Sequence, residues 1–295
     1  MFSPPARPPL ALLPHLALQP YFESFDALIK LDAEQRVASL NTLAQKIKLQ
    51  NSFDQALRFR TSRGGVKATD YEWAIAGSQG LESAYIDTRI VGHDGQHDLL
   101  NALCWLRFPR TKACLNWLQA GEIAPLIGQE SGLRSARRDQ ITLFDENGAI
   151  LLTQDESLVA ALNARDWRAL FLQKRSQLIE HSSLHIVGHG LLQKCLTPFK
   201  SMTARVWVLN LPADTELATV DECLAANISA AWPTWIKRLL PIAGWPGWSD
   251  EVQDEAFYSD RKVFRPWERG TGFLASRKNI EPLPTSAAST VNPSR

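Results

Sequence analysis

HDLLNALCWLRFPRTKACLNWL, residues 97–118, is the stretch that decides how this chain folds. Apolar residues fill most of its positions, so a helix formed here lacks a continuous polar face and must be buried. Pro109 has no backbone N–H and pushes Phe108 out of helical geometry, which ends or kinks a helix at that point. We therefore expect two consecutive buried helices, 97–107 and 109–119, that meet at Phe108.

Three polar side chains at the start of this stretch conflict with its apolar character. His97 and Asn101 are four residues apart and Asp98 is three residues before Asn101, so a helix places all three along one edge. A buried polar group without a partner costs about 2–7 kcal/mol, so these residues must be paired or face a cavity. A neutral His97 is usable as a base or a metal ligand. Alternatively, Asp98 caps the helix while His97 and Asn101 tie down neighbouring loops.

Strand patterns outside this stretch are few. QITLFDENGAILLT, residues 140–153, has apolar-rich runs on either side of Asn147-Gly148, which predicts a tight hairpin. LHIVG at 184–188 and TARVWVLNL at 203–211 predict two further strands, while helical patterns dominate elsewhere. The expected fold class is therefore α+β, a mostly helical single globular domain with a small sheet.

The two ends of the chain differ in composition from its middle. Six prolines among the first twenty residues predict an irregular proline-rich arm over 1–20. The globular domain is expected over 21–270. Residues 271–295 are expected to form a tail whose last fifteen residues, EPLPTSAASTVNPSR, are disordered.

Composition argues against several classes of partner. The 295 residues carry 32 basic and 31 acidic side chains, a net charge of +1 that gives no general attraction to nucleic acid or to a membrane surface. Four cysteines form no C-x-x-C pair and suit reduced thiols. The early prolines interrupt any signal-peptide core, and no run approaches the roughly 18 apolar residues of a membrane helix. We expect a cytoplasmic protein without a membrane or nucleic-acid partner.

A second set of polar residues stands at the two ends of the first strand of the predicted hairpin. Along that strand, Arg138 faces one side and Asp139 the other, the apolar side, where Asp139 is placed to orient a histidine. Asp145, Glu146 and Asn147 are ordinary turn residues for a hairpin tip, and only Asp145 stays a candidate among them.

A third polar group lies where the strand at 184–188 ends. His189 stands between two glycines, and Lys194 follows about one helical turn later. A turn rich in glycine lets a ligand approach the backbone closely. Turns of this kind are also common where no ligand binds.

Four segments together resemble the bacterial "domain of unknown function 3025" family. They are HDLLNALCWLRFPRTKACLN, RRDQITLFDENG, GHGLLQKCLTPF and PIAGWPGW…FYSDRKVFRPW, and they follow the family's order across roughly residues 20–270. The resemblance implies polar family positions at His97, Asp98, Asn101, Lys112, Asn116, Arg138, Asp139, Thr142, Asp145, Glu146, His189 and Lys194, with a Tyr-Glu pair at Tyr71-Glu72. The family brings no known activity, so the resemblance implies a shared site and leaves the reaction open.

These observations predict one polar site in a cavity. The expected catalytic residues are His97, Asp98, Asp139 and His189, and the expected substrate-binding residues are Asn101, Lys112, Arg138 and Lys194. Such residues suit a hydrolase or transferase that acts on a small anionic substrate by acid–base or metal-assisted chemistry. A divalent metal is compatible with them, although no dependable metal motif is present. The alternative is a noncatalytic binding or scaffold protein whose polar core is structural.

The segment 240–267 is rich in aromatic residues but has neither helical nor strand periodicity. Its large rings disfavour contact with water, so it must pack against the domain. We expect a structural strap, and the alternative is a lid over the site.

Overall fold

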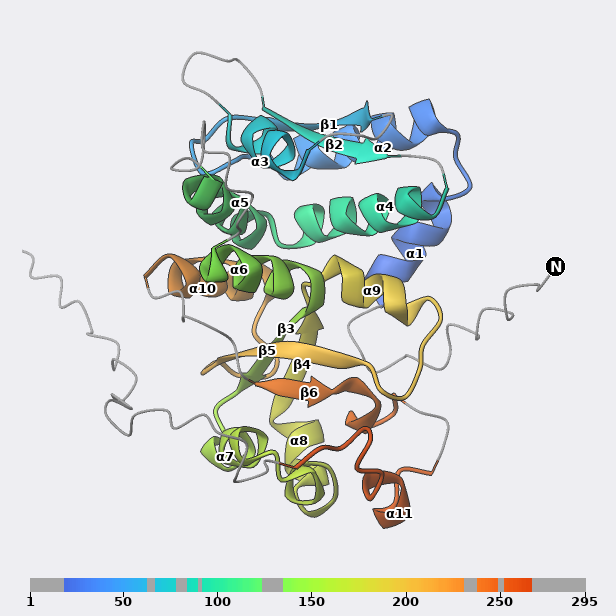
Figure 1. Cartoon of the computed structure of the whole chain (residues 1–295), viewed down its shortest axis with the longest axis vertical. Helices are drawn as coiled ribbons and strands as arrows, with labels where there is room; N and C mark the ends of the chain where they lie inside the picture. Colours follow the sequence, from blue (N-terminus) through green and yellow to red (C-terminus); the bar gives the residue numbers. More distant parts are fainter. Residues whose placement is uncertain are drawn as a thin grey trace, which may run out of the picture.

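The stretch quoted first folds as two helices, as expected. They are α4 (Gly92–Arg107) and α5 (Pro109–Ile123), and Phe108 between them is fully buried. Helix α4 begins earlier than predicted, so His97 lies more than one turn inside it. Both helices cross the middle of the molecule in the computed structural model (Figure 1).

The structure describes residues 19–62, 67–77, 84–89, 92–123, 135–230, 238–248 and 252–266. The expected arm lies outside these residues except for Gln19 and Pro20, which begin the first helix. The expected tail lies wholly outside them. Among the described helices, none combines the length and the apolar character needed to cross a lipid bilayer.

A small parallel sheet lies on one side of α4 and α5 (Figure 1). Strands β1 (Leu57–Ser62) and β2 (Ala84–Arg89) pair in parallel, and α3 (Ala68–Ala76) lies between them in the sequence. Helices α1 (Gln19–Leu28) and α2 (Ala33–Lys46) complete this part, with Asp32 in a capping box at the start of α2.

A four-stranded sheet lies on the other side of the central helices, beyond α6 (Ala136–Asn147), α9 (His189–Cys195) and α10 (Leu217–Ala230) (Figure 1). Its strand order is β4 (Ser182–Ile186), β3 (Gly148–Thr153), β5 (Thr203–Leu209) and β6 (Leu239–Pro241). Strand β3 is antiparallel to β4 and parallel to β5, and all six of its residues are buried. The α+β class and the strands at 184–188 and 203–211 are confirmed.

The prediction of a hairpin near residues 140–153 is wrong. Residues 136–147 form helix α6, which Ser135 caps by accepting a hydrogen bond from the Arg138 N–H at 3.0 Å. Ile141 and Phe144, three residues apart, bury one face of this helix. Gly148 has an ordinary extended φ of −76° and starts β3, so Asn147-Gly148 is a junction between a helix and a strand.

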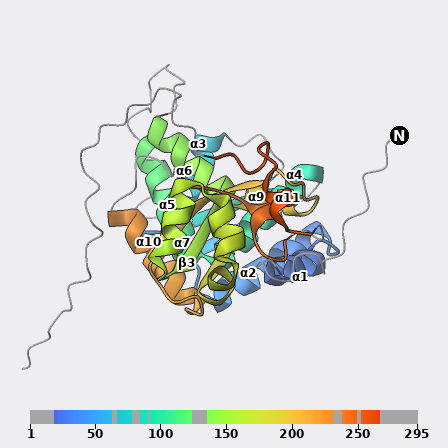
Figure 2. The ribbon, with the colours of Figure 1, turned by 90° about the horizontal axis from the view of Figure 1, so that it is seen from below.

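The far face of the four-stranded sheet carries a layer that Figure 2 shows from below, with α7 near its centre and α11 beside it. The layer contains α7 (Glu156–Ala164), the π-helix η3 (Ala169–Gln173), α8 (Arg175–Glu180), the 3-10 helix η4 (Ile242–Gly244) and α11 (Glu255–Tyr258).

The aromatic segment, residues 238–248 and 252–266, belongs to this layer. Its described large rings are all at most 7% exposed: Trp245, Trp248, Phe257, Tyr258 and Phe264. Phe171 of η3 stacks on Tyr258 with ring centroids 5.4 Å apart. This packing is that of a strap. The segment lies on the opposite side of the four-stranded sheet from α4, α6 and α9 (Figure 1). Trp267 lies outside the described residues.

Candidate metal centre

Pairing of β3 with β4 brings two distant helix ends together. Ala149 at the start of β3 is opposite Ile186 at the end of β4, and the N–H groups of Val187 and Gly188 both donate to the Gly148 carbonyl, at 3.0 and 2.9 Å. Helix α6 ends immediately before β3, and α9 starts immediately after Gly188. The last turn of α6 therefore lies beside the first turn of α9.

Glycines make this close approach possible. A Cβ at Gly188 would lie 2.4 Å from the backbone N of Gly148, and one at Gly190 would lie 2.3 Å from Oε2 of Glu146. Neither distance is sterically allowed, so any larger residue forces α6 and α9 apart or displaces the Glu146 carboxylate. The GHG sequence is therefore required by the packing of two helix ends.

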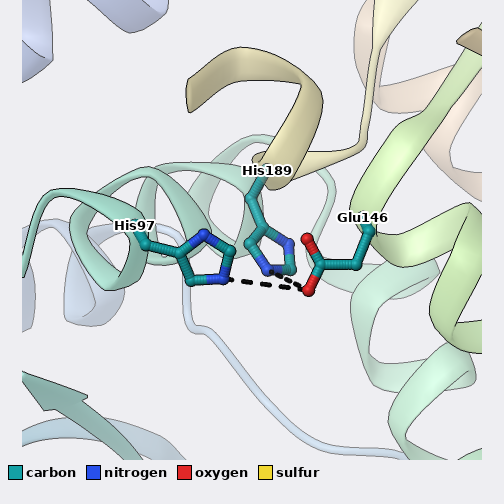
Figure 3. Close-up of side chains that lie close together, drawn as sticks. All are labelled: His97, Glu146 and His189. Atoms are coloured by element: carbon teal, nitrogen blue, oxygen red, sulfur yellow. Dashed lines mark ion pairs between the residues drawn. The ribbon is translucent and has the colours of Figure 1, made fainter. Parts of the chain in front are cut away.

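Three side chains converge at this junction (Figure 3). Oε1 of Glu146 lies 3.5 Å from Nε2 of His189 and 3.8 Å from Nε2 of His97. The two imidazole rings meet edge to face with centroids 4.5 Å apart. One nitrogen or oxygen from each of the three residues lies within 4.8 Å of the others. We call His97, Glu146 and His189 the triad.

This spacing suits a divalent cation. Zinc binds nitrogen and carboxylate oxygen at about 2.0–2.2 Å, so two tetrahedral ligand atoms are about 3.3–3.6 Å apart. The two distances to Oε1 of Glu146 are at this value or slightly above it. Two imidazoles and one carboxylate form a ligand set used by zinc and by non-haem iron, and they leave coordination positions open.

The hydrogen bond to His97 fixes its ring for this role. Nδ1 of His97 lies 2.9 Å from Oε1 of Gln193, an amide oxygen that can only accept. Nδ1 therefore carries a hydrogen, and Nε2 is the nitrogen that faces Glu146. Metal-binding histidines are commonly held through their other nitrogen in this way.

A carboxylate lies behind His189. Its side chain is 6% exposed, and its Nδ1 is buried without a hydrogen bond among the described residues. Oδ2 of Asp145 lies 3.8 Å from this nitrogen, and Oδ1 of Asp145 accepts a hydrogen bond from Nζ of Lys112. A carboxylate behind a histidine raises the basicity of the nitrogen that binds metal. Asp145 thus lies between His189 of the triad and Lys112.

Electrostatics keep the Glu146 carboxylate ionised. Burial alone would raise its pKa, but the interaction with His189 and the charges of His97 and Lys112 outweigh burial and lower the pKa to about 2. An ionised carboxylate is the form that binds metal.

The structure separates the four expected catalytic residues into two groups. His97 and His189 lie together, as expected. Asp98 instead binds Arg89 of β2 through three hydrogen bonds, from the backbone N–H at 2.7 Å and from Nε and Nη2 at 2.9 Å each. Asp139 is exposed and lies about two turns, roughly 10 Å, before Glu146 on α6. The strand geometry that placed Asp139 on the apolar side is wrong, because residues 136–147 form a helix.

The four expected substrate-binding residues also differ in position. Nζ of Lys112, 3% exposed, donates to Asn101 Oδ1 at 2.8 Å, and Asn101 donates to the Tyr71 hydroxyl at 2.8 Å. Arg138 is buried on α6. Lys194 is exposed and donates to Asn147 Oδ1 at 2.6 Å, next to the triad. Of the four, only Lys194 is on the surface.

Sequence reasoning missed two contributors to the site. Glu146 was expected to be a turn residue, since the hairpin placed it at a tip, and only the family resemblance pointed to it. Gln193 gave no signal, although its position four residues after His189 on a helix is recognisable once α9 is known.

The fold and the triad define an α+β protein with a two-histidine, one-carboxylate cluster of the kind that binds divalent cations. The sequence profile of a family described as protein of unknown function (DUF3025) matches residues 57–268. The chain belongs to this family. No curated protein and no solved structure gives a significant match.

Proposed function

We propose that this protein is a metal-dependent hydrolase whose cation is held by the triad. The observation that carries the proposal is the convergence of Nε2 of His97, Nε2 of His189 and Oε1 of Glu146 from three different helices. A cation bound by only three protein ligands keeps a position for water, and it lowers the pKa of that water toward neutrality.

Exposure of the triad supports a catalytic site over a closed structural one. The His189 side chain is buried, but those of His97 and Glu146 are 25% and 34% exposed. A bound cation is therefore reachable by a small molecule from the His97 and Glu146 side.

Charge near this side suits the small anionic substrate expected from the sequence. The exposed Lys194 follows Gln193, the partner of His97, and its Nζ binds Asn147, the neighbour of Glu146. An ammonium group here attracts a carboxylate or phosphate toward the cation. A transferase reaction, in which the group passes to an acceptor other than water, uses the same arrangement of cation and Lys194.

The compartment proposed is the cytoplasm of a bacterium. None of the four cysteines, all of which lie in the described residues, forms a disulfide, and Cys104, Cys114 and Cys195 are buried. Free thiols are typical of reducing compartments.

Metal analysis of the purified protein tests this proposal directly. We expect about one zinc or other first-row divalent cation per chain after incubation and dialysis. His97→Ala, His189→Ala and Glu146→Gln should each lose most of it. His181→Ala, which alters an exposed histidine outside the triad, should keep it. A wild-type protein that retains no cation, or a triad variant that binds as well as wild type, contradicts the proposal.

A noncatalytic scaffold is the second candidate function. The observation that favours it is the chain of hydrogen bonds from Tyr71 through Asn101 and Lys112 to Asp145, which joins α3, α4, α5 and α6. Satisfied polar networks of this kind can specify a fold without catalysis. A protein that binds no cation and unfolds at much lower temperature when His97 or His189 is replaced would favour the scaffold.

A further inference from the structure

A second polar site includes Asp145, whose other carboxylate oxygen faces His189 of the triad. A cavity of about 20 Å³ lies between α3, α4, α5 and α6, and Glu72, Lys112, Gln119 and Asp145 are among its lining residues. One water molecule needs about 10–15 Å³ and two to four polar partners. The cavity therefore has the size and the walls for about one water molecule.

The Glu72 carboxyl is held at this cavity by one firm hydrogen bond. Asn116, itself buried, donates from Nδ2 to Oε2 of Glu72 at 2.7 Å and to the Glu72 carbonyl at 3.0 Å. This amide fixes the carboxyl against the wall of the cavity. As a hydrogen-bond donor it also favours the charged form of Glu72, against the effect of burial.

Gln119 supplies an independent observation. It is 6% exposed, and its Nε2 donates to Oγ1 of Thr142 at 2.8 Å, so its amide orientation is fixed. Its Oε1 is buried and has no hydrogen-bond partner among the described residues. A buried acceptor of this kind requires a donor, which a neutral carboxyl or a water molecule provides.

Charges around Glu72 oppose one another. Asp145 of α6 disfavours a second carboxylate, while Lys112 of α5 and Arg138 of α6 favour it. Burial is the largest influence, and it raises the pKa of Glu72 to about 7 in spite of the Asn116 hydrogen bond. Tyr71, next to Glu72, has a raised pKa because of burial and stays neutral. The raised pKa places the change of charge of Glu72 near neutral pH.

We infer that Glu72 is a proton-exchanging side chain of this protein, which exchanges its proton through the cavity beside the Lys112–Asp145 pair. Its link to the triad rests on the proposed function. Asp145 faces both His189 of the triad and the cavity at Glu72. Positive charge added at the triad therefore offsets the repulsion between the Asp145 and Glu72 carboxylates. Binding of a divalent cation at the triad therefore stabilises the Glu72 carboxylate and releases its proton.

The first test uses the full-length protein without added metal. Infrared spectra recorded between pH 5 and pH 9 should show a protonated carboxyl band that disappears with a midpoint near neutral pH. The band should be missing in Glu72→Gln and present in Glu122→Gln, which changes a carboxyl paired with Ser135 and Arg137. The glutamine at position 72 keeps an oxygen for Asn116, so this variant should fold. A band that persists in Glu72→Gln, or no such band in wild type, overturns the inference.

The second test measures the coupling. Zinc is titrated by calorimetry at pH 7 in two buffers of different ionisation enthalpy, which gives the protons released per zinc bound. Wild type and Glu122→Gln should release more protons than Glu72→Gln, with a difference that disappears at pH 5 and pH 9. Equal release in all three proteins overturns the inference and leaves the metal centre standing. Absence of zinc binding contradicts the metal centre instead, and the infrared band then decides the inference alone.

Discussion

Two buried regions on opposite sides of the four-stranded sheet use their glutamines differently. Gln253 in the aromatic segment donates to the carbonyls of Ala243 and Trp245 and accepts from the Gly247 N–H and from Arg175, so its amide is fully used. Gln119, which lines the cavity beside Glu72 and Asp145, leaves Oε1 without a partner among the described residues. The polar atoms of Gln253 are thus satisfied within the protein, whereas Gln119 keeps one buried acceptor without a donor from the described residues. This division is typical of proteins that sacrifice some stability for function.

The largest expected effect is a loss of stability in the layer that contains the aromatic segment. Phe171 is fully buried, stacks on Trp167 and Tyr258, and touches the position a Cβ would occupy at Gly244. Phe171→Ala should lower the free energy of unfolding by about 3–5 kcal/mol, measured by urea denaturation. The exposed Phe53 is the control, and Phe53→Ala should change stability by less than about 0.5 kcal/mol. Equal losses in both variants would remove the contrast between the two regions.

A substitution at the helix junction should act mainly on the triad. In Gly190→Ala the new methyl group displaces the Glu146 carboxylate, so zinc affinity should fall about 10–100-fold in calorimetric titrations. Gly121 on α5 has nothing within 4 Å of an added Cβ. Gly121→Ala should keep zinc affinity and gain up to about 1 kcal/mol of stability. Unchanged affinity in Gly190→Ala would show that Glu146 does not bind the cation.

The pH dependence of stability should separate the two regions as well. The pKa of Glu72 is raised in the folded protein, so its contribution is fully present below the unfolded pKa of about 4.5 and is lost as the pH rises to about 7. Glu72→Gln lacks this loss. It should therefore be more stable than wild type at pH 8 by about 1–2 kcal/mol, with no such gain at pH 4. Denaturation curves with the same pH dependence in both proteins would contradict this expectation.

The smallest expected effect concerns His97 without metal. Its side chain is partly exposed, so His97→Ala should change the free energy of unfolding of the metal-free protein by less than about 1 kcal/mol in either direction. His185 on β4 is the comparison, since its side chain is outside the triad and burial lowers its pKa to about 4. A loss of several kcal/mol in His97→Ala would assign the polar region a structural role.

Much of the fold could be predicted from the sequence because its signals are local. Pro109 separates α4 from α5 in any context, and the apolar run at 203–211 contains β5. The hairpin failed because Ile141 and Phe144 suit a helix as well as a strand, and Asn147-Gly148 suggested a turn. The cap by Ser135 was the local signal that favours the helix.

The same error explains what could be predicted of the site. His97 and His189 were assigned to one site because His97 lies in an apolar helix, His189 lies in a glycine-flanked turn, and the family resemblance gives both as polar positions. Asp139 was chosen because a strand places it on the apolar side, and Glu146 was passed over because the predicted hairpin placed it at a tip. The pairing that brings α6 to α9 lies between residues far apart in the sequence, and no local pattern reports it.

Along the chain, His97 lies about fifty residues before Glu146, and Glu146 about forty before His189. A cation that binds all three therefore acts as a cross-link. Like a disulfide over a long loop, it restricts the unfolded chain, but it can be removed with a chelator. The cross-link joins α4, in the central layer, to the two helices that flank the start of β3. The apparent melting temperature of this protein is then a property of the free cation concentration as well as of the chain.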